Sequence, residues 1–392
     1  MTRTNTDLSN TQHTFNFHGN ATEFFGIWIV NILLTIVTFG IYSAWAKVRT
    51  NNYFYGNTEL DGDRFEYLAK PMQILIGRII AVVALIAWTI LSGVHPVAAI
   101  ACGALLTLAI PYLSVRNIRF DARITRFRNV RFNFEGSYSG AYLNILAKPL
   151  AAYAIIIGSS MGFSALLMES NPAIAVIGGI LLFTLTGVFG YAWVMTGMAS
   201  YVVNGYRYGG KQFSAELDMG EYAKIAALAG ALFLGSMILG FLIILGFGMF
   251  DTIASLFSGE TLDPANHASS FLALFAGYIY MFFIGFVIAA FIKTRIRNYL
   301  FSKTQIDDKL QLVSNMTLGG YLSLIITNLL IVVFTFGLGG AWTDIRRAQY
   351  MASITQVEGD LALMSVRDHS QETNNAIADE MVDAFDINLN II

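Results

Sequence analysis

The sequence predicts an all-α polytopic membrane protein, a helical bundle of six to eight hydrophobic helices with short cytoplasmic β-hairpins between helix pairs. Three observations predict this fold class. Of the 392 residues, 55% are hydrophobic and 13% are charged, whereas an average soluble domain carries about 25% charged residues. The apolar residues form long blocks, and about 20 such residues in a helix match the hydrocarbon thickness of a bilayer. Lysine and arginine gather in alternate links between these blocks.

Eight hydrophobic segments can be read along the chain. They cover residues 24–46, 73–92, 97–115, 144–168, 173–199, 223–249, 269–292 and 321–342. The polar first 20 residues contain no apolar signal-peptide core, so we expect the first hydrophobic segment to act as the insertion signal. Residues 1–365 are expected to form one integral membrane domain, followed by a mobile acidic tail over 366–392.

Five links between these segments are polar and basic, and they are expected to form β-hairpins. Asp61-Gly62 in the first link is a strong hairpin signal, because both central turn positions need a positive φ. Each link opens on an aromatic residue, followed five positions later by Thr or Tyr. The aromatic residues are Tyr53, Phe120, Tyr201, Tyr299 and Tyr350, and the later residues are Thr58, Thr125, Tyr206, Thr304 and Thr355. A turn comes next in each link, and the residues that follow the five turns are Phe65, Phe132, Phe213, Leu310 and Leu361.

The two ends of the chain repeat each other without a gap, over residues 24–63 and 321–360. Both copies contain an asparagine, the tripeptide Thr-Phe-Gly and an Ala-Trp pair in the same spacing. A shorter repeat aligns residues 15–19 with residues 132–136, within the second hairpin link. The sequence therefore predicts internal repeats in addition to a membrane location.

Charge predicts which links face the cytoplasm. The links at 92–96, 169–172 and 251–267 contain no Lys or Arg, so the positive-inside rule places them outside and the hairpins inside. Two topologies remain open. All eight segments cross the membrane with both termini outside, or six cross and the segments at 24–46 and 321–342 re-enter, with both termini inside. The similarity of residues 15–19 to a cytoplasmic strand favours the second topology.

Three stretches of the sequence resemble the YjgN-type family of bacterial inner-membrane proteins. They are residues 15–19, residues 38–49 (TFGIYSAWAKVR) and residues 53–58 (YFYGNT), and the resemblance extends over residues 12 to 365. The resemblance implies a polytopic protein of the inner membrane of a Gram-negative bacterium. It implies no substrate and no catalytic residue, because the family is a domain of unknown function.

The related end segments carry the candidate functional residues. Transporters often build a midplane site from broken helices in corresponding positions of two repeats, although helix bending with interfacial tryptophan anchors also explains the pattern. A charge at membrane depth, such as Arg78, is a functional hypothesis, unless it snorkels to the interface. The candidate solute site comprises Asn31, Thr38, Gly40, Trp45, Arg78, Asn328, Thr335, Gly337 and Trp342.

The second hairpin link is rich in arginine with interleaved phenylalanine. This pattern occurs in nucleic-acid-binding proteins, but beside a bilayer the simpler interpretation is contact with anionic lipid headgroups. We therefore expect membrane lipids rather than nucleic acid as partners, and a homo-oligomer or a membrane-protein partner stays open. The candidate headgroup contacts are Arg116, Arg119, Arg123, Arg126, Arg128 and Arg131.

No enzymatic motif is complete. Residues 205–212 nearly fit a phosphate-binding loop, but Gln212 stands where Ser or Thr is needed. The GxSxG pattern at 158–162 lies in a hydrophobic helix, where small residues favour helix packing. No His, Cys or carboxylate spacing fits a metal site, so we expect no metal, no cofactor and no enzymatic activity. Two functions remain: a carrier or channel for a small or lipidic solute that uses the paired broken helices, or a scaffold or assembly factor that presents hairpin edge strands.

Overall fold

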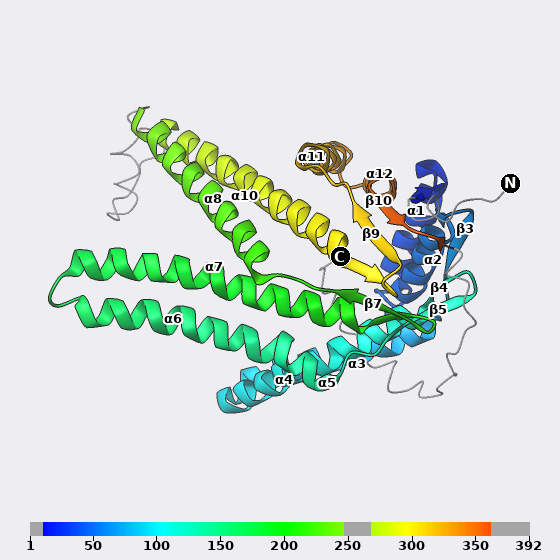
Figure 1. Ribbon diagram of the computed structural model, residues 1–392, viewed down its shortest axis with the longest axis horizontal. Helices are drawn as coiled ribbons and strands as arrows, with labels where there is room; N and C mark the ends of the chain where they lie inside the picture. Colours follow the sequence, from blue (N-terminus) through cyan, green and yellow to red (C-terminus); the bar gives the residue numbers. More distant parts are fainter. Residues whose placement is uncertain (1–10, 247–267, 362–392) are drawn as a thin grey trace.

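Ten short strands form a closed antiparallel barrel at one end of the molecule (Figure 1). The computed structural model describes residues 11–246 and 268–361. The order around the barrel is β1-β10-β9-β8-β7-β6-β5-β4-β3-β2, closed by pairing of β2 with β1. The strands are β1 (Gln12–Phe17), β2 (Thr58–Leu60), β3 (Asp63–Tyr67), β4 (Thr125–Phe127), β5 (Val130–Phe134), β6 (Tyr206–Tyr208), β7 (Lys211–Ala215), β8 (Thr304–Ile306), β9 (Leu310–Ser314) and β10 (Thr355–Glu358).

Each pair of strands is bridged by a hairpin of helices, so the described residues form five βααβ units. The helices are α1 (Ala21–Val37), α2 (Ser43–Gly56), α3 (Pro71–Val94), α4 (Pro96–Ile124), α5 (Tyr138–Ala141), a π-helical turn (Tyr142–Ala147), α6 (Lys148–Leu167), α7 (Pro172–Gly205), α8 (Met219–Gly246), α10 (Ala268–Lys303), α11 (Leu318–Phe334) and α12 (Gly340–Ser353). Unit 1 runs from β1 to β2, unit 2 from β3 to β4, unit 3 from β5 to β6, unit 4 from β7 to β8 and unit 5 from β9 to β10. The helical hairpins fan out from the barrel (Figure 1).

The predicted all-α bundle is therefore wrong, because the hairpins pair with one another into a closed barrel. Four of the five predicted hairpins are present as adjacent strands. The fifth is different, since β10 takes its partner from the other end of the chain, where His13 lies opposite Val357. This explains why residues 15–19 resemble residues 132–136: β1 occupies in the fifth hairpin the place that β5 occupies in the second.

The seam between β1 and β10 is held without a connecting turn. Thr14 pairs with Gln356, and the Gly359 amide donates to the Thr11 carbonyl at 3.0 Å. The Gln12 amide side chain donates to Glu358 Oε1 at 2.8 Å. The barrel thus closes through strand pairing alone.

Alternate residues of the strands point into the barrel, as the two-residue period of a strand requires. At the turn end of the barrel they form a buried cluster, called here the barrel plug. Its members are Leu60, Phe127, Val130, Tyr208, Ile306, Leu310, Val357 and Leu361. The Tyr208 hydroxyl donates to the Phe127 carbonyl at 2.9 Å, and burial raises the pKa of Tyr208 to about 12. Packing rather than charge therefore fills this end of the barrel.

One register prediction needs correction. Leu310 lies opposite Ile306, across a turn with three residues instead of two. The residue of β9 that matches Phe65, Phe132 and Phe213 is therefore Leu312, which packs with them beside the plug. Because of the additional turn residue, Leu312 follows Thr304 by eight positions, whereas Phe65 follows Thr58 by seven.

The aromatic residue that opens each link ties the second helix of its unit to the start of the first. The Tyr201 hydroxyl donates to the Ser137 carbonyl at 2.8 Å, and the Asp218 amide donates to the Tyr299 hydroxyl at 2.7 Å. Tyr53 and Tyr350 make the equivalent bonds in units 1 and 5. Unit 2 has Phe120 at this position, which packs but cannot donate. Four of the five βααβ units are thereby closed at their base by a hydrogen bond, and unit 2 by packing alone.

Units 2, 3 and 4 contain the six helices that are long and apolar enough to cross a membrane among the described residues. Units 1 and 5 have only 17 residues in their first helix, about 25 Å of helix. Both strands of unit 1 lie in the barrel, where Phe17 pairs with Thr58. Since α1 and α2 start and end at the same side, the structure favours six crossings with two returning hairpins over eight crossings.

Candidate functional site

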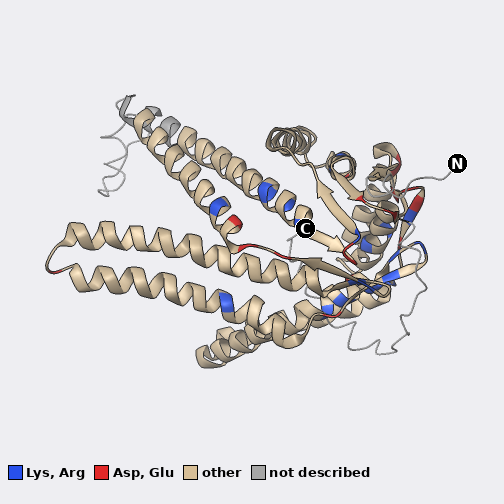
Figure 2. Cartoon of the chain, in the orientation of Figure 1, with Lys and Arg blue, Asp and Glu red and all other residues tan. Residues whose placement is uncertain are grey.

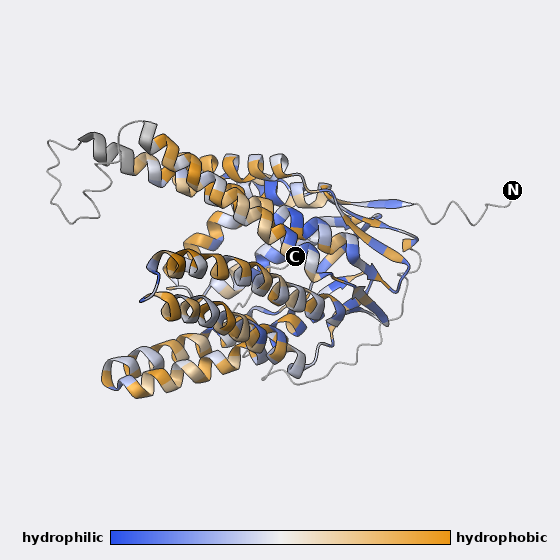
Figure 3. Cartoon of the chain, turned by 60° about the vertical axis from the view of Figure 1, so that its left-hand side comes forward, coloured by the Kyte–Doolittle hydropathy of each residue, from blue (hydrophilic) through white to orange (hydrophobic). Residues whose placement is uncertain are grey.

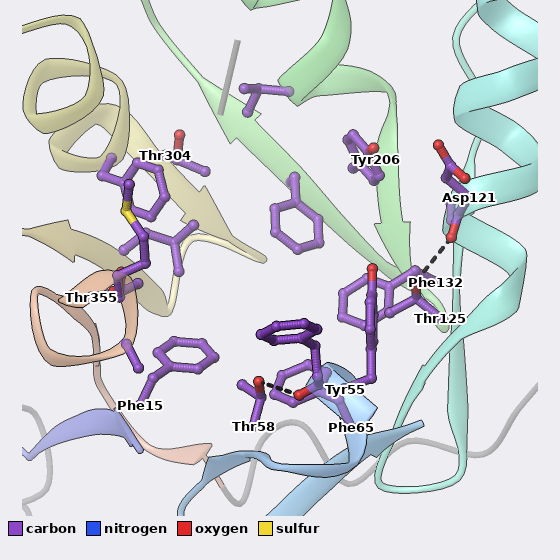
Figure 4. Close-up of a pocket in the computed structure, with 18 of the residues that line it drawn as sticks. Phe15, Tyr55, Thr58, Phe65, Asp121, Thr125, Phe132, Tyr206, Thr304 and Thr355 are labelled. Carbon is purple, nitrogen blue, oxygen red and sulfur yellow. Dashed lines mark hydrogen bonds between the residues drawn. The ribbon is translucent and has the colours of Figure 1, made fainter. Parts of the chain in front are cut away.

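A cavity of about 600 Å³ lies where the barrel meets the helix ends (Figure 4). All five units contribute equivalent positions to its wall. The inward residues of the longer strands are Phe15, Phe65, Phe132, Phe213 and Leu312, and the first residues of the shorter strands are Thr58, Thr125, Tyr206, Thr304 and Thr355. Residues from the ends of α2, α4, α7, α10 and α12 complete the lining, and they are Phe54, Tyr55, Asp121, Ala122, Val203, Leu300, Phe301, Ala348, Met351 and Ala352. We call it the axial cavity.

The four threonines of the axial cavity use their hydroxyl protons locally. Thr58 Oγ1 donates to the Phe54 carbonyl at 2.8 Å, and Thr304 Oγ1 donates to the Leu300 carbonyl at 2.7 Å. Thr125 and Thr355 make the same bond four residues back. These carbonyls belong to the last helical turn, where intrahelical partners are lacking. The recurring threonine therefore satisfies a helix end and leaves the cavity wall mainly carbon.

Few groups in the axial cavity can ionise. Burial raises the pKa of the Tyr55 phenol, although a hydrogen bond with Thr125 partly opposes this. Burial also raises the pKa of Tyr206. Both phenols therefore stay neutral near pH 7. Asp121 is the one carboxylate among the lining residues (Figure 4). The chemistry of the wall suits an apolar ligand with a small polar end.

The predicted solute site is not part of this cavity, since none of its nine residues is among the lining residues. Thr38 and Thr335 lie at the turns of the short helical hairpins. Each hydroxyl donates a hydrogen bond to the carbonyl four residues earlier and accepts one from the backbone amide four residues later. Gly40 and Gly337 follow with φ of 90° and 89°. Such backbone conformations favour glycine. The Thr-Phe-Gly repeat thus forms two nearly identical turns.

The paired asparagines join the two helices of each short hairpin. Asn31, which is buried, donates to the Ala46 carbonyl at 3.4 Å and to Thr50 Oγ1 at 3.3 Å. Asn328 donates to the Thr343 carbonyl at 3.3 Å. Neither asparagine lines the axial cavity. Their role in a solute path stays a prediction.

The tryptophans and Arg78 also contact the short hairpins. Trp45 packs beside Tyr42, whereas Trp342 of unit 5 packs on Phe25 of unit 1 with ring centroids 4.9 Å apart. Arg78 of α3 donates to Ser43 at the turn of the first hairpin. Arg78 is seven residues into α3, about 10 Å along the helix. The turn of the first hairpin therefore lies beside α3 about 10 Å from the start of that helix.

The six candidate headgroup arginines have different surroundings. Arg128 forms ion pairs with Asp61 and Asp63, and Arg126 pairs with Glu66 across the neighbouring strand. Arg119 donates to the Tyr138 hydroxyl and the Gly136 carbonyl. Arg116 lies over Tyr112 near the end of α4. The side chain of Arg131 is half-buried, and Arg123 lies one residue before the end of α4. Lipid contact stays a prediction, and the barrel arginines also serve strand pairing.

The residues that line the axial cavity were visible in the sequence as hairpin markers. In the sequence, the Thr or Tyr after each opening aromatic residue and the Phe after each turn indicate only strand positions. Their meeting point depends on closure of the barrel, which the spacing within one link does not encode. Among the described residues no group of three His, Cys, Asp or Glu side chains could hold a metal ion.

The family model described as "Bacterial protein of unknown function (DUF898)" matches residues 12–384. The chain belongs to the DUF898 family. Its relatives include the proteins named Inner membrane protein YjgN from Escherichia coli O157:H7 and from Escherichia coli strain K12. They are 27% identical over 367 and 366 residues, which cover 89% of both chains in each comparison. The protein of the same name from Salmonella typhimurium is 25% identical over 377 residues, 94% of both chains.

These matches confirm the resemblance to YjgN-type proteins that the DUF898 chain carries in residues 38–58. Together with the six long apolar helices, they confirm an inner-membrane protein with several spans. No solved structure matches the DUF898 chain. The barrel and its cavity are therefore interpreted from their own geometry.

Proposed function

We propose that the protein is a carrier that binds a lipidic ligand in the axial cavity. The observation that carries this proposal is the cavity itself, about 600 Å³ and lined mainly by carbon. Ligand pockets commonly measure about 300–1,000 Å³ and are mostly apolar with a few polar groups. Here Tyr55, Tyr206 and Asp121 would supply those groups at the end where α4 meets the barrel.

The position of the cavity favours a ligand from the bilayer. The spanning helices carry large apolar side chains on their outer surfaces, and Figure 3 shows these helices leading from the more polar barrel. At the turn end, the plug fills the barrel, which opposes a continuous channel along the barrel axis. A ligand that enters between the helical hairpins and stops at the plug is consistent with a carrier. The scaffold function through hairpin edges is not supported, because the closed barrel leaves no unpaired strand among the described residues.

The cavity can be tested by filling it. Ala348 lies in its wall, so Ala348→Trp should lower the affinity for a fluorescent fatty acid at least tenfold, measured by displacement in a neutral detergent. Ala352→Phe, on the same wall, provides a second filling variant. Ala87→Trp on the exposed surface of α3 should leave the affinity unchanged. If both filling variants elute as monodisperse protein and bind the fatty acid as tightly as the wild type, the axial cavity is excluded as the binding site.

We further propose that the barrel lies in the cytoplasm. Lys and Arg gather at the barrel end of the helices (Figure 2), and the positive-inside rule assigns such ends to the cytoplasm. Labelling with a membrane-impermeant maleimide in intact cells tests this, with Cys102→Ala as the background. Ser170→Cys, in the short link after α6, should be labelled, and Gln212→Cys, exposed on β7, should be labelled only after lysis. Labelling of Gln212→Cys in intact cells would contradict a cytoplasmic barrel.

A further inference from the structure

A second cavity, of about 490 Å³, lies in unit 3 between the barrel, the start of α6 and the last turns of α7. Its wall is polar and basic, unlike that of the axial cavity. We propose that it binds the phosphate of an anionic phospholipid headgroup. This inference rests on different residues from the proposed carrier function and does not depend on it. We call this second cavity the unit 3 cavity.

Lys148 is the central cation of this cavity. Its ammonium donates to Asn144 Oδ1 at 2.8 Å, which leaves two further N–H donors of the ammonium for a ligand. The nitrogen also lies 5.9 Å from the Trp193 ring centroid. The lysine is therefore held in place by a neutral amide and a ring, and no carboxylate of residues 11–246 or 268–361 is its ion-pair partner.

The backbone around Lys148 is shaped to hold this arrangement. Asn144 is buried within the π-helical turn Tyr142–Ala147, and such turns occur often at functional sites. Across the cavity, Gly197 provides the room, because a Cβ there would lie 2.5 Å from the lysine nitrogen and 2.6 Å from Asn144 Oδ1. The lysine and the asparagine thus lie directly against α7.

The opposite wall supplies a second cation. Arg207 forms an ion pair with Glu135 at 3.1 Å and donates to the carbonyls of Asn204 and Tyr206. With Lys148 and Arg207 against Glu135, the lining carries one net positive charge. The Ser200 hydroxyl is a further polar group of the wall. Ammonium, guanidinium and hydroxyl groups are the donors that bind phosphate oxygens in proteins.

The place of the cavity points to a lipid as the source of the phosphate. Trp193 is of the residue type that gathers at membrane interfaces. Leu143, within the π-helical turn, and Leu150, two residues after Lys148, are exposed on the outer surface of the helix. A bound headgroup would therefore have its acyl chains beside apolar helix surface. Anionic lipids attract basic groups at this depth.

The test compares lipids on the purified full-length protein by native mass spectrometry in a neutral detergent. Phosphatidylglycerol should bind at least tenfold more tightly than phosphatidylcholine to the wild type. Lys148→Gln should abolish this preference at one site, and Lys148→Arg should retain it. Lys224→Gln removes an exposed lysine that pairs with Glu221 at the start of α8, so it should keep the preference.

Two further measurements distinguish a bound lipid headgroup from free phosphate and from binding without lipid preference. If inorganic phosphate alone competes fully with phosphatidylglycerol at millimolar concentration, the site binds free phosphate and the lipid proposal is overturned. Equal binding of both lipids by the wild type also overturns it, whether or not the Lys148→Gln variant folds. Because the cavities have different linings, Lys148→Gln should leave fatty-acid displacement unchanged and Ala348→Trp should leave the lipid preference unchanged.

Discussion

Replacing Phe127 by alanine is expected to lower the free energy of unfolding by about 3–5 kcal/mol. The side chain is 1% exposed in the barrel plug. Its ring stacks on Phe65 with centroids 4.6 Å apart and lies near Tyr208. Loss of the ring would leave a cavity that the surrounding strands cannot close, since their pairing fixes their spacing. The shift can be measured as a lower melting midpoint in detergent.

Phe39→Ala is the matched control for this substitution. Phe39 is 98% exposed at the turn of the first short hairpin, so its truncation should change the melting midpoint in detergent little. If the two variants melt at the same temperature, the plug does not hold the barrel together. A lower melting midpoint for Phe39→Ala alone would contradict the assignment of the Phe39 side chain to the outer surface.

The second large effect is expected at the barrel seam. Changing the three inward residues of β1 to serine should abolish folding, because Phe15 stacks on Phe65 and Phe17 stacks on Phe54. Each truncated phenylalanine costs up to about 3–5 kcal/mol, and total stabilities of proteins are about 5–15 kcal/mol. The substitutions are His13→Ser, Phe15→Ser and Phe17→Ser. The readout is the monodisperse fraction in size-exclusion chromatography.

The outward residues of the same strand provide the control. Gln12→Ser, Thr14→Ser and Asn16→Ser change the same number of side chains but retain the inward face. This variant should elute as wild type, with a small loss from the Gln12 to Glu358 hydrogen bond. Monodisperse elution of the inward variant would mean that β1 is not needed to close the barrel.

Local signals in the sequence were sufficient for the membrane helices and the hairpins. Block lengths predicted the spans, and Asp61-Gly62 predicted a turn that has the expected positive φ at both residues. The barrel could not be predicted in this way. Its closure depends on pairing of β1 with β10, whose paired residues Gln12 and Glu358 are 346 positions apart. The repeat of residues 15–19 was the one sequence signal of that pairing.

The candidate site was harder to predict because the clearest repeat in the sequence does not line the cavity. The repeat of Thr-Phe-Gly correctly marked two equivalent turns, but those turns point away from the barrel and Phe336 is 97% exposed. The cavity instead forms where five different links converge. A threonine that caps a helix end looks the same in sequence as one in any strand. Only the closed ring of units gives Thr58 and Thr304 a common surface.

The seam also determines the order in which the protein can be completed during synthesis. The first strand leaves the ribosome long before its partner β10, because Glu358 comes 346 positions after Gln12. At about 5–20 residues per second this interval lasts roughly 20–70 s. All six long helices are synthesised within it, so their membrane insertion precedes barrel closure. Throughout this time one edge of β1 is unpaired and open to wrong strand partners, which makes the nascent chain, rather than the finished protein, the state most exposed to misassembly.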